Sequence, residues 1–252
     1  MVAQTAQLPN VKKLFLPDED HVIIDCDLAQ ADAQVVAWEA DDEQLKAIFR
    51  DPTADLHTEN AKTIFGHFSK RNRSLAKAGV HATNYGASAA TLARALGITT
   101  QEANRFQRTW FQAHPGIRDW HTRVENQLAT TRQVSNRFGN FRYYFDRVQS
   151  LLPEALAWIP QSTVALVINR ALVNVDANLR GVVTPLMQVH DSLVMQIHKS
   201  NYPSILPELK KNMEIVVPYD DPLIIPVGIE MSDTSWGDVR EVSWETGEYI
   251  DE

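Results

Sequence analysis

The chain has 252 residues, of which 44% are hydrophobic and 22% are charged, and this composition is enough for a buried core. It contains no long low-complexity run, which argues against a disordered protein. The formal net charge of −8 indicates that any nucleic-acid-binding surface must be local, because such proteins usually carry a basic footprint.

The single cysteine, Cys26, excludes a disulfide framework and is typical of a reducing compartment. No stretch approaches the roughly 18 apolar residues of a membrane span, and the N-terminus has no signal-peptide pattern. We therefore expect a cytoplasmic protein with no membrane contact.

The elements of the first half of the chain are predicted from hydrophobic periodicity. A Val-Ile-Ile run before Asp27 is typical of a mostly buried strand, and the preceding Pro-Asp-Glu-Asp sequence indicates a turn. Helical patterns follow, ended by Pro52 and Gly66. The expected elements are strands over 13–16 and 21–28, then helices over 30–49, 55–65 and 73–126, the last with breaks at 86 and 97–100.

The second half contains turn signals that separate strands from a long helix. Gly139-Asn140 indicates a hairpin, Pro160 an interruption of the helix, and His190-Asp191-Ser192 a tight turn. The expected elements are a hairpin over 136–145, a helix over 154–179, strands over 184–189 and 193–197, a helix over 203–216 and a strand over 223–230. The predicted fold class is α+β, a small antiparallel sheet carrying helices with a helical excursion inserted between strands.

Two aspartates stand out by their positions. Asp27 ends a strand, and Asp191 lies in a turn between two strands. Carboxylates held at the rim of a sheet on adjacent strands can bind Mg²⁺ ions about 3.5–4 Å apart for in-line phosphoryl transfer. From the spacing alone, an ordinary turn-forming role of both aspartates is the favoured interpretation.

A second pattern combines cations and rings. Arg73, Lys77, His81 and Tyr85 are four residues apart, so they lie along one face of a helix. Two cations, an imidazole and a phenol make a poor core face but suit a nucleotide, with its phosphates and flat base. A solvated basic helix remains the alternative interpretation of this spacing.

These motifs together resemble those of family A, the bacterial polymerase I-like DNA polymerases. The sequence from Asp27 to Gln34 resembles motif A, the sequence from Arg73 to Gly86 motif B, and Gln188 to Ser192 motif C. Asp55-Leu-His-Thr with Ile64-Phe-Gly resembles the block after motif A, and Ile159-Pro-Gln-Ser-Thr a palm helix. The motifs occur in the family's order from about residue 12 to residue 238.

The resemblance implies a palm with inserted fingers and a template-directed transfer of dNTP to a primer 3′-OH with two Mg²⁺ ions, or Mn²⁺. It implies three groups of site residues. The metal ligands would be Asp27, the Leu28 carbonyl and Asp191; the nucleotide contacts Gln30, Asp32, Arg73, Lys77, His81 and Tyr85; and the DNA contacts Tyr85, Gly86, Gln161 and His190. Lys77 would also serve as a general acid toward the leaving pyrophosphate.

Several residues depart from the family pattern. Asp32 stands where the family has the Glu that crowds a ribose 2′-OH, His81 replaces an aromatic ring, and Ser192 replaces the motif C Glu. None of these removes a principal metal ligand, so we expect altered sugar selection rather than an inactive enzyme. Ser192 also fits the single-subunit RNA polymerases, which are the second hypothesis, and a non-catalytic primer–template scaffold is the third.

The resemblance also sets the expected domains: 1–66 as the first part of the palm, 67–130 as fingers, and 131–252 as the second part of the palm with an acidic tail. Only 26 residues precede Asp27, whereas the family has a helical thumb there. We expect a second polypeptide to supply the thumb and N-terminal palm, together with an exonuclease domain, as in a split phage-type polymerase.

Overall fold

The computed structural model describes residues 10–250, so the last two residues of the expected acidic tail lie outside the described part. The chain forms two compact units. The sheet unit comprises the residues up to Ala29, Ala165–Val216 and the residues from Ile224 onward. The helical unit comprises Gln30–Val164 and Val217–Leu223.

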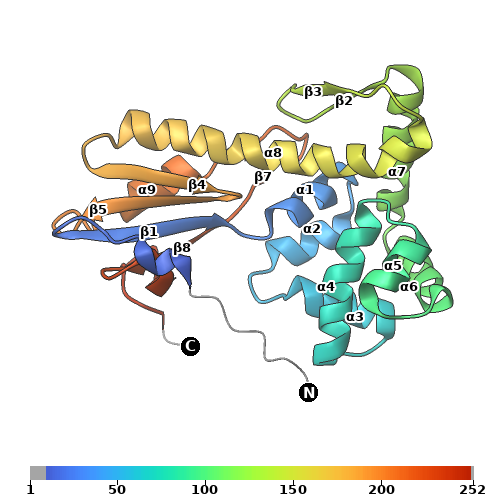
Figure 1. The fold of residues 1–252 in the computed structure, drawn as a ribbon, viewed down its shortest axis with the longest axis horizontal. Coiled ribbons are helices and arrows are strands. Elements are labelled where there is room, and N and C mark those ends of the chain that lie inside the picture. The colour runs from blue at the N-terminus through green and yellow to red at the C-terminus, as the bar shows by residue number, and fades with distance from the viewer. Residues whose placement is uncertain (1–9, 251–252) are drawn as a thin grey trace. The chain divides into compact units, whose positions relative to one another are not determined.

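The sheet unit is built on a five-stranded antiparallel sheet with the strand order β4-β5-β1-β8-β9 (Figure 1). Its central strand β1 is flanked by β5 and β8, and the side chains of Ile23, Val194 and Trp236 form a buried cluster. The strands are β1 (His21–Leu28), β4 (Val183–Val189), β5 (Ser192–His198), β8 (Val227–Ser232) and β9 (Arg240–Glu241). The remaining short elements are η1 (Val11–Leu14), α9 (Leu206–Met213), β6 (Val216–Val217), β7 (Leu223–Ile224) and η2 (Trp236–Asp238).

The strand predicted over 13–16 is wrong, because the structure has the short 3₁₀ helix η1 at Val11–Leu14. The Asn10 side chain accepts a hydrogen bond from the Lys12 amide and so caps this turn. Beyond it, the Phe15 carbonyl accepts from the Trp236 amide at 2.9 Å, and the two rings meet edge to face. The segment therefore packs onto η2 instead of pairing with β1.

The helical unit consists of seven helices and one hairpin, together with the first part of α8, within the described residues. One predicted helix, over 30–49, is two: Asp41 has a positive φ of 52°, and the Asp42 side chain caps the second helix. The elements are α1 (Ala31–Glu39), α2 (Glu43–Arg50), α3 (Leu56–Phe65), α4 (Lys70–Asn84), α5 (Ala89–Leu96), α6 (Thr100–Ala113), α7 (Pro115–Thr130), β2 (Gln133–Ser135), β3 (Phe141–Tyr143) and α8 (Val148–Asn178).

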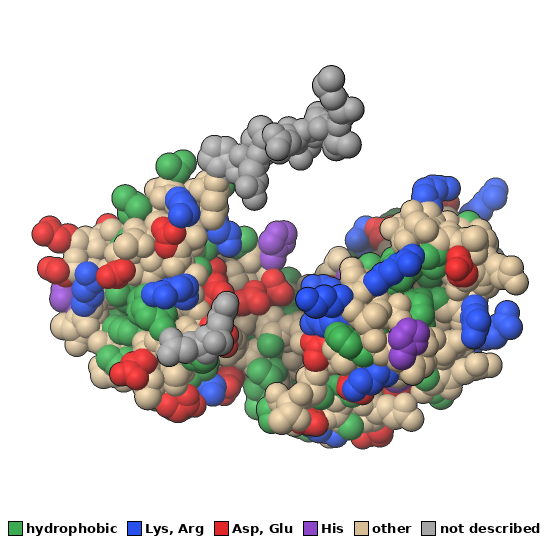
Figure 2. All heavy atoms as spheres, turned by 90° about the horizontal axis from the view of Figure 1, so that it is seen from below, with side chains coloured by type: hydrophobic (Ala, Val, Ile, Leu, Met, Phe, Trp, Pro, Cys, Tyr) green, Lys and Arg blue, Asp and Glu red, His purple; other side chains and the backbone are tan. Residues whose placement is uncertain are grey.

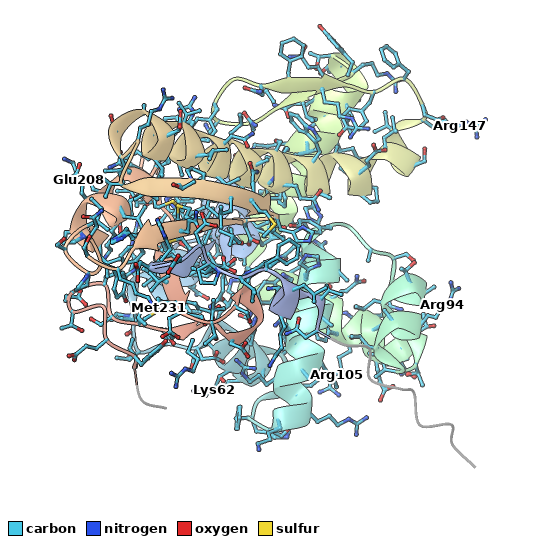
Figure 3. The ribbon with its side chains drawn as sticks, turned by 60° about the vertical axis from the view of Figure 1, so that its left-hand side comes forward. Lys62, Arg94, Arg105, Arg147, Glu208 and Met231 are labelled. Carbon is cyan, nitrogen blue, oxygen red and sulfur yellow. The ribbon has the colours of Figure 1, made fainter. Side chains whose placement is uncertain are left out.

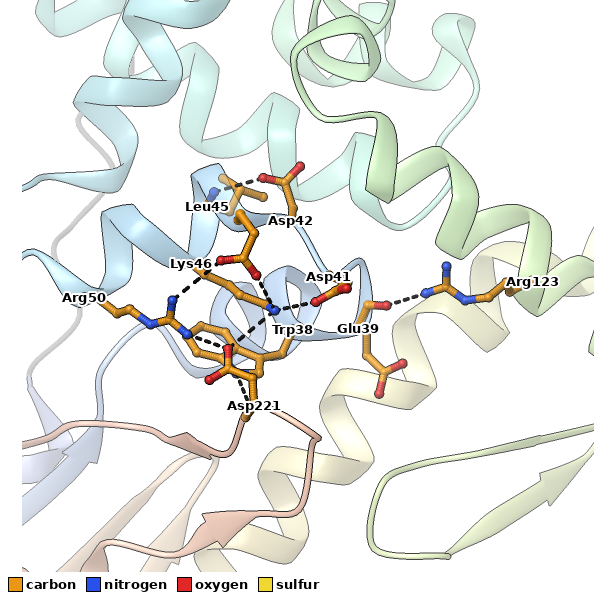
Figure 4. A network of polar contacts seen from close by, with 10 residues as sticks. Trp38, Glu39, Asp41, Asp42, Leu45, Lys46, Arg50, Arg123 and Asp221 are labelled. Atoms are coloured by element: carbon orange, nitrogen blue, oxygen red, sulfur yellow. Dashed lines mark hydrogen bonds and ion pairs between the residues drawn. The ribbon is translucent and has the colours of Figure 1, made fainter.

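A buried lysine ties α1 and α2 to the 217–223 segment (Figure 4). The Lys46 side chain is 2% exposed and forms ion pairs with Asp41, Glu43 and Asp221. A buried charge is tolerated only when it is paired in this way. The network fixes the turn between α1 and α2, and thereby the C-terminal end of α1, whose first turn contains Asp32.

Helix α8 is continuous through Pro153 and Pro160, so the predicted interruption near Pro160 is wrong. A proline removes one helical hydrogen bond, but burial of Leu156, Ile159 and Ile168 holds the helix together. Among the described residues, its segment 150–178 is the one helix long and apolar enough to cross a membrane by length and composition. Half of its most apolar window is buried inside the protein, as in the core helix of a folded domain.

The fold class predicted from the sequence, α+β with an antiparallel sheet, is confirmed.

Candidate active site

The two predicted metal-binding aspartates lie at one end of the sheet. Asp27 pairs with Ser192 across β1 and β5, and the Leu28 amide donates a hydrogen bond to the Asp191 carbonyl at 3.1 Å. The turn between β4 and β5 contains His190, whose φ of 54° gives the tight reversal that puts Asp191 beside the end of β1. Backbone hydrogen bonding thus brings Asp27, Leu28 and Asp191 together.

The Asp27 carboxylate lies in a negative environment. Partial burial, and then the charges of Asp191, Asp25 and Glu230, raise its pKa to about 6. Repulsion between neighbouring carboxylates is the condition that a bound divalent cation relieves. The donor set is two carboxylates and a backbone carbonyl, hard oxygen ligands that fit Mg²⁺.

Within residues 10–250, no group of three or more His, Cys, Asp and Glu side chains is arranged to hold a metal ion. Two carboxylates can form part of an Mg²⁺ coordination shell where water and substrate phosphates supply the remaining ligands.

The sequence prediction missed a third aspartate near this end of the sheet, Asp25, which lies on β1 with Asp27. Asp25 is 6% exposed, its Oδ2 accepts a hydrogen bond from the Trp236 indole at 2.7 Å, and it pairs in register with Glu230 of β8. The available signal was the two-residue spacing from Asp27, which places both on one face of the strand. Asp25 adds negative charge beside Asp27, and its hydrogen bond with Trp236 holds η2 against β1.

The stripe predicted along a helix lies on α4, and its first member is already paired. Arg73 makes a bidentate ion pair with Asp55 at the start of α3, with Nε–Oδ1 at 2.9 Å and Nη2–Oδ2 at 2.7 Å. This pairing lowers the pKa of Asp55 well below its usual range. Lys77 and His81 are exposed one and two turns further along. Lys and Arg side chains stand out over this unit in Figure 2.

The other end of the stripe is tied to α1. The Tyr85 hydroxyl donates a hydrogen bond to Asp32 Oδ2 at 2.9 Å, and the His81 and Tyr85 rings meet edge to face at 4.5 Å. Burial, and next the negative charge of Asp32, raises the pKa of the Tyr85 hydroxyl. The phenol is therefore a fixed hydrogen-bond donor.

A cavity of about 490 Å³ lies between α1, α3 and α4. It is lined by apolar side chains and by polar side chains of the predicted stripe. His57 also lines the cavity, although the sequence prediction gave this residue no role. His57 Nδ1 is buried and has no hydrogen-bond partner among the described residues. Burial, and then the positive charge of Lys77, lowers the pKa of His57. The lining includes Asp32, Val36, Leu56, His57, Asn60, Lys77, His81, Asn84 and Tyr85.

The remaining predicted residues have distinct positions. Gly86 has a φ of +73°, and a Cβ there would lie 3.1 Å from Leu156 of α8. Gln30 begins α1 in the left-handed conformation and is exposed, and Gln161 is exposed on α8. Asp27, Leu28, His190 and Asp191 belong to the sheet unit, and the other predicted site residues belong to the helical unit.

An antiparallel sheet with paired carboxylates at one end, and a separate helical unit with a cationic stripe, define the class of palm-and-fingers folds. The family model for DNA polymerase family A matches residues 2–238. The chain therefore belongs to DNA polymerase family A.

Individual relatives agree with this family. The chain is 32% identical over 231 residues to the thermostable DNA polymerase I of Thermus filiformis, covering 87% of this chain and 28% of that protein. It is 29% identical over 230 residues to DNA polymerase I of Streptococcus pneumoniae, covering 85% and 26%. Its fold resembles the POL domain of Pol1 from M. smegmatis, in a complex with DNA primer-template and dNTP, with a TM-score of 0.81, 24% identity and coverage of 90% and 42%. The chain thus spans little more than a quarter of the length of these relatives.

Proposed function

We propose that this chain is a catalytic part of a DNA-directed DNA polymerase that transfers a nucleotide from dNTP to a primer 3′-OH. The observation that carries the proposal is the backbone pairing of Leu28 with Asp191, which places Asp27 and Asp191 at the same end of the sheet. The M. smegmatis domain, bound to primer-template and dNTP, supports the same substrates for this chain.

In this proposal Asp27, Asp191 and the Leu28 carbonyl hold two Mg²⁺ ions, with Mn²⁺ as a substitute. When bound, the ions supply charge stabilisation for in-line phosphoryl transfer. The raised pKa of Asp27 means that this carboxylate ionises fully only in neutral or basic solution or beside a cation.

The α4 stripe binds and orients the nucleotide. Lys77 neutralises triphosphate charge and donates a proton to the leaving pyrophosphate, a general-acid role. Arg73 contacts the same phosphates after exchanging part of its pairing with Asp55. His57, which lines the cavity with Lys77, is the further phosphate contact that we add to this set.

The remaining nucleotide and template contacts come from both units. Asp32 on α1 borders the sugar, and Gln30 lies at the start of that helix. His81 on α4 stacks near the sugar. Tyr85 and Gly86 face the template, and Gln161 and His190 contact primer–template DNA. The palm (1–66 and 131–252) and fingers (67–130) boundaries remain part of this proposal.

A second polypeptide that binds the duplex is also part of the proposal. Duplex affinity depends largely on the number of cations that neutralise phosphates, and this chain has 24 Lys and Arg against 32 Asp and Glu. A basic partner that carries a thumb would supply the missing charge. We place the assembly in the cytoplasm.

Primer extension with dNTPs and with NTPs, by the wild type and by Asp191→Ala, tests the proposal. Extension with dNTPs that requires Asp191 supports it. Preferential extension with NTPs would assign the chain to the RNA polymerase-like alternative, and binding without extension to the scaffold alternative. Adding candidate basic partners to the purified chain tests the second polypeptide: strong duplex binding by the chain alone would contradict it.

A further inference from the structure

The hairpin formed by β2 and β3 carries a row of exposed aromatic rings. Phe141, Tyr143 and Phe145 are 56%, 52% and 92% exposed, although side chains of this size are usually buried. They alternate with Arg142 and with Tyr144, which is 3% exposed. Within β3 the two-residue period puts Phe141 and Tyr143 on one face, and the Phe145 ring just beyond the strand contacts that of Tyr143, whereas Tyr144 is buried.

The rings form a ladder. The Phe141 and Tyr143 centroids are 5.5 Å apart with the planes at 76°, and those of Tyr143 and Phe145 are 6.4 Å apart with the planes at 29°. In register, Phe141 faces Ser135 and Tyr143 faces Gln133, so the neighbouring strand contributes short or polar side chains to this face. The neighbouring strand therefore leaves these side chains exposed, with Phe145 the most exposed of the three.

The platform is rigid. Asn136, 5% exposed, accepts hydrogen bonds from the amides of Phe138 and Asn140 and donates one to the Ser162 hydroxyl on α8 at 3.0 Å. The Tyr144 amide donates to the Arg132 carbonyl at 2.8 Å. Rings on a fixed hairpin lose little freedom on binding, which favours a stacking role over simple surface decoration.

The hairpin segment is rich in arginine. Residues 132–147 include four arginines and one aspartate, in a chain whose net charge is −8. Arg142 pairs with Glu154 and Arg137 with Glu39, while Arg147, two residues after Phe145, projects from the ribbon (Figure 3). Exposed rings interleaved with arginines match the alternating bases and phosphates of a single strand.

We propose that the face of Phe141, Tyr143 and Phe145 binds single-stranded nucleic acid by base stacking, with Arg147 neutralising a phosphate. The proposal goes beyond nucleotide transfer and does not depend on it. In a duplex the base faces are covered by their neighbours, so this ladder selects unpaired bases.

The test is fluorescence anisotropy of the purified full chain with labelled oligo-dT, at low salt, in EDTA and without dNTP. Phe141→Ala, Tyr143→Ala and Phe145→Ala should each weaken binding by about five- to a hundredfold. Tyr143→Phe keeps the ring and should bind like the wild type. Phe68→Ala, which removes a ring that is 51% exposed elsewhere in the helical unit, is the matched control and should have no effect.

Arg147→Ala should weaken binding and reduce the slope of log K against log salt by about 0.7, one phosphate contact on a single strand. Thermal melts should be unchanged, because the substituted side chains are exposed. Absent oligo-dT binding by the wild type would overturn the proposal, as would an equal loss in Phe68→Ala or an equal loss of blunt-duplex binding in the ring variants. Because the assay contains neither metal nor dNTP, its failure would leave the polymerase proposal standing.

Discussion

The Tyr85 hydroxyl donates a hydrogen bond to Asp32 Oδ2 at 2.9 Å, joining the end of α4 to the first turn of α1. Asp32, the proposed sugar contact, and Tyr85, the proposed template contact, are therefore joined by a hydrogen bond, and both line the cavity. A change at either residue is expected to alter the position of the other.

We predict that Asp32→Ala lowers the preference for dNTP over NTP, and that Asp32→Glu raises it because the longer side chain crowds a 2′-hydroxyl. The expected change is a few-fold to a hundredfold, about 1–3 kcal/mol. Single-nucleotide incorporation at saturating primer–template measures the ratio. Tyr85→Phe keeps the ring and removes only its hydrogen bond to Asp32, so it should shift the ratio less than Asp32→Ala. An unchanged ratio in both Asp32 variants would remove this residue from sugar selection.

For α4, we predict that Arg73→Ala mainly raises KM for dNTP and that Lys77→Ala mainly lowers kcat, because a proton transfer is lost with the phosphate contact. Arg71→Ala, an exposed arginine on the same helix, is the matched control. Duplex affinity should be the same in all three variants. Loss of duplex binding with normal nucleotide kinetics would assign the stripe to DNA instead.

The Asp55–Arg73 pair should be worth little to stability, because both side chains are about two-fifths exposed. We expect a coupling free energy of unfolding of about 0.2–1 kcal/mol from a double-mutant cycle with Asp55→Asn and Arg73→Ala. Its effect should appear in nucleotide binding, where Asp55→Asn releases Arg73 and changes KM. A KM equal to that of the wild type would show that Asp55 does not position Arg73.

The pKa of Asp27 gives a prediction for stability. Its folded value of about 6 lies above the ordinary 3.8, so its contribution to stability is fully present below pH 4 and is lost as pH rises through 6. Asp27→Asn should therefore raise Tm at pH 7–8 without divalent metal, and the difference should vanish near pH 4. Mg²⁺ should raise the Tm of the wild type more than that of the variant. Equal Tm values at pH 8 and equal responses to Mg²⁺ would contradict the repulsion described here.

Much of this site was predictable from local sequence, because its residues lie at strand ends, turns and one helix face. The β4–β5 turn at His190-Asp191 and the α4 stripe follow from spacing that backbone geometry fixes. What the spacing did not predict depends on distant partners. Asp55 forms an ion pair with Arg73, which lies 18 residues further along the chain. His57 lines a cavity between three helices. Residues 13–16 do not form the strand that their pattern predicts, because Phe15 packs against Trp236. Pro160 interrupted the helix in the prediction because burial of neighbouring side chains is not visible locally.

One glycine permits the close approach of α4 and α6. A Cβ at Gly79 would lie 2.5 Å from Phe106 Cζ. Gly79→Ala is therefore expected to lower the free energy of unfolding by about 1–3 kcal/mol through overpacking. Phe106→Leu in the same chain should recover part of this loss, whereas a simple helix-propensity effect would make Gly79→Ala stabilising. Chemical denaturation of the single and double variants separates the two outcomes.

The most direct test of the polymerase assignment is single-turnover addition of one dNTP to a primer, with Mg²⁺ and excess primer–template. The variants are Asp27→Ala and Asp191→Ala, with Glu208→Ala on α9 as the matched carboxylate control (Figure 3). We predict that both aspartate variants lose nucleotide addition while retaining the wild-type fold, because they share the charge stabilisation of the transition state. Glu208→Ala should react at the wild-type rate. Activity within about tenfold of wild type, or 1.4 kcal/mol in the barrier, for either aspartate variant would contradict the two-metal site.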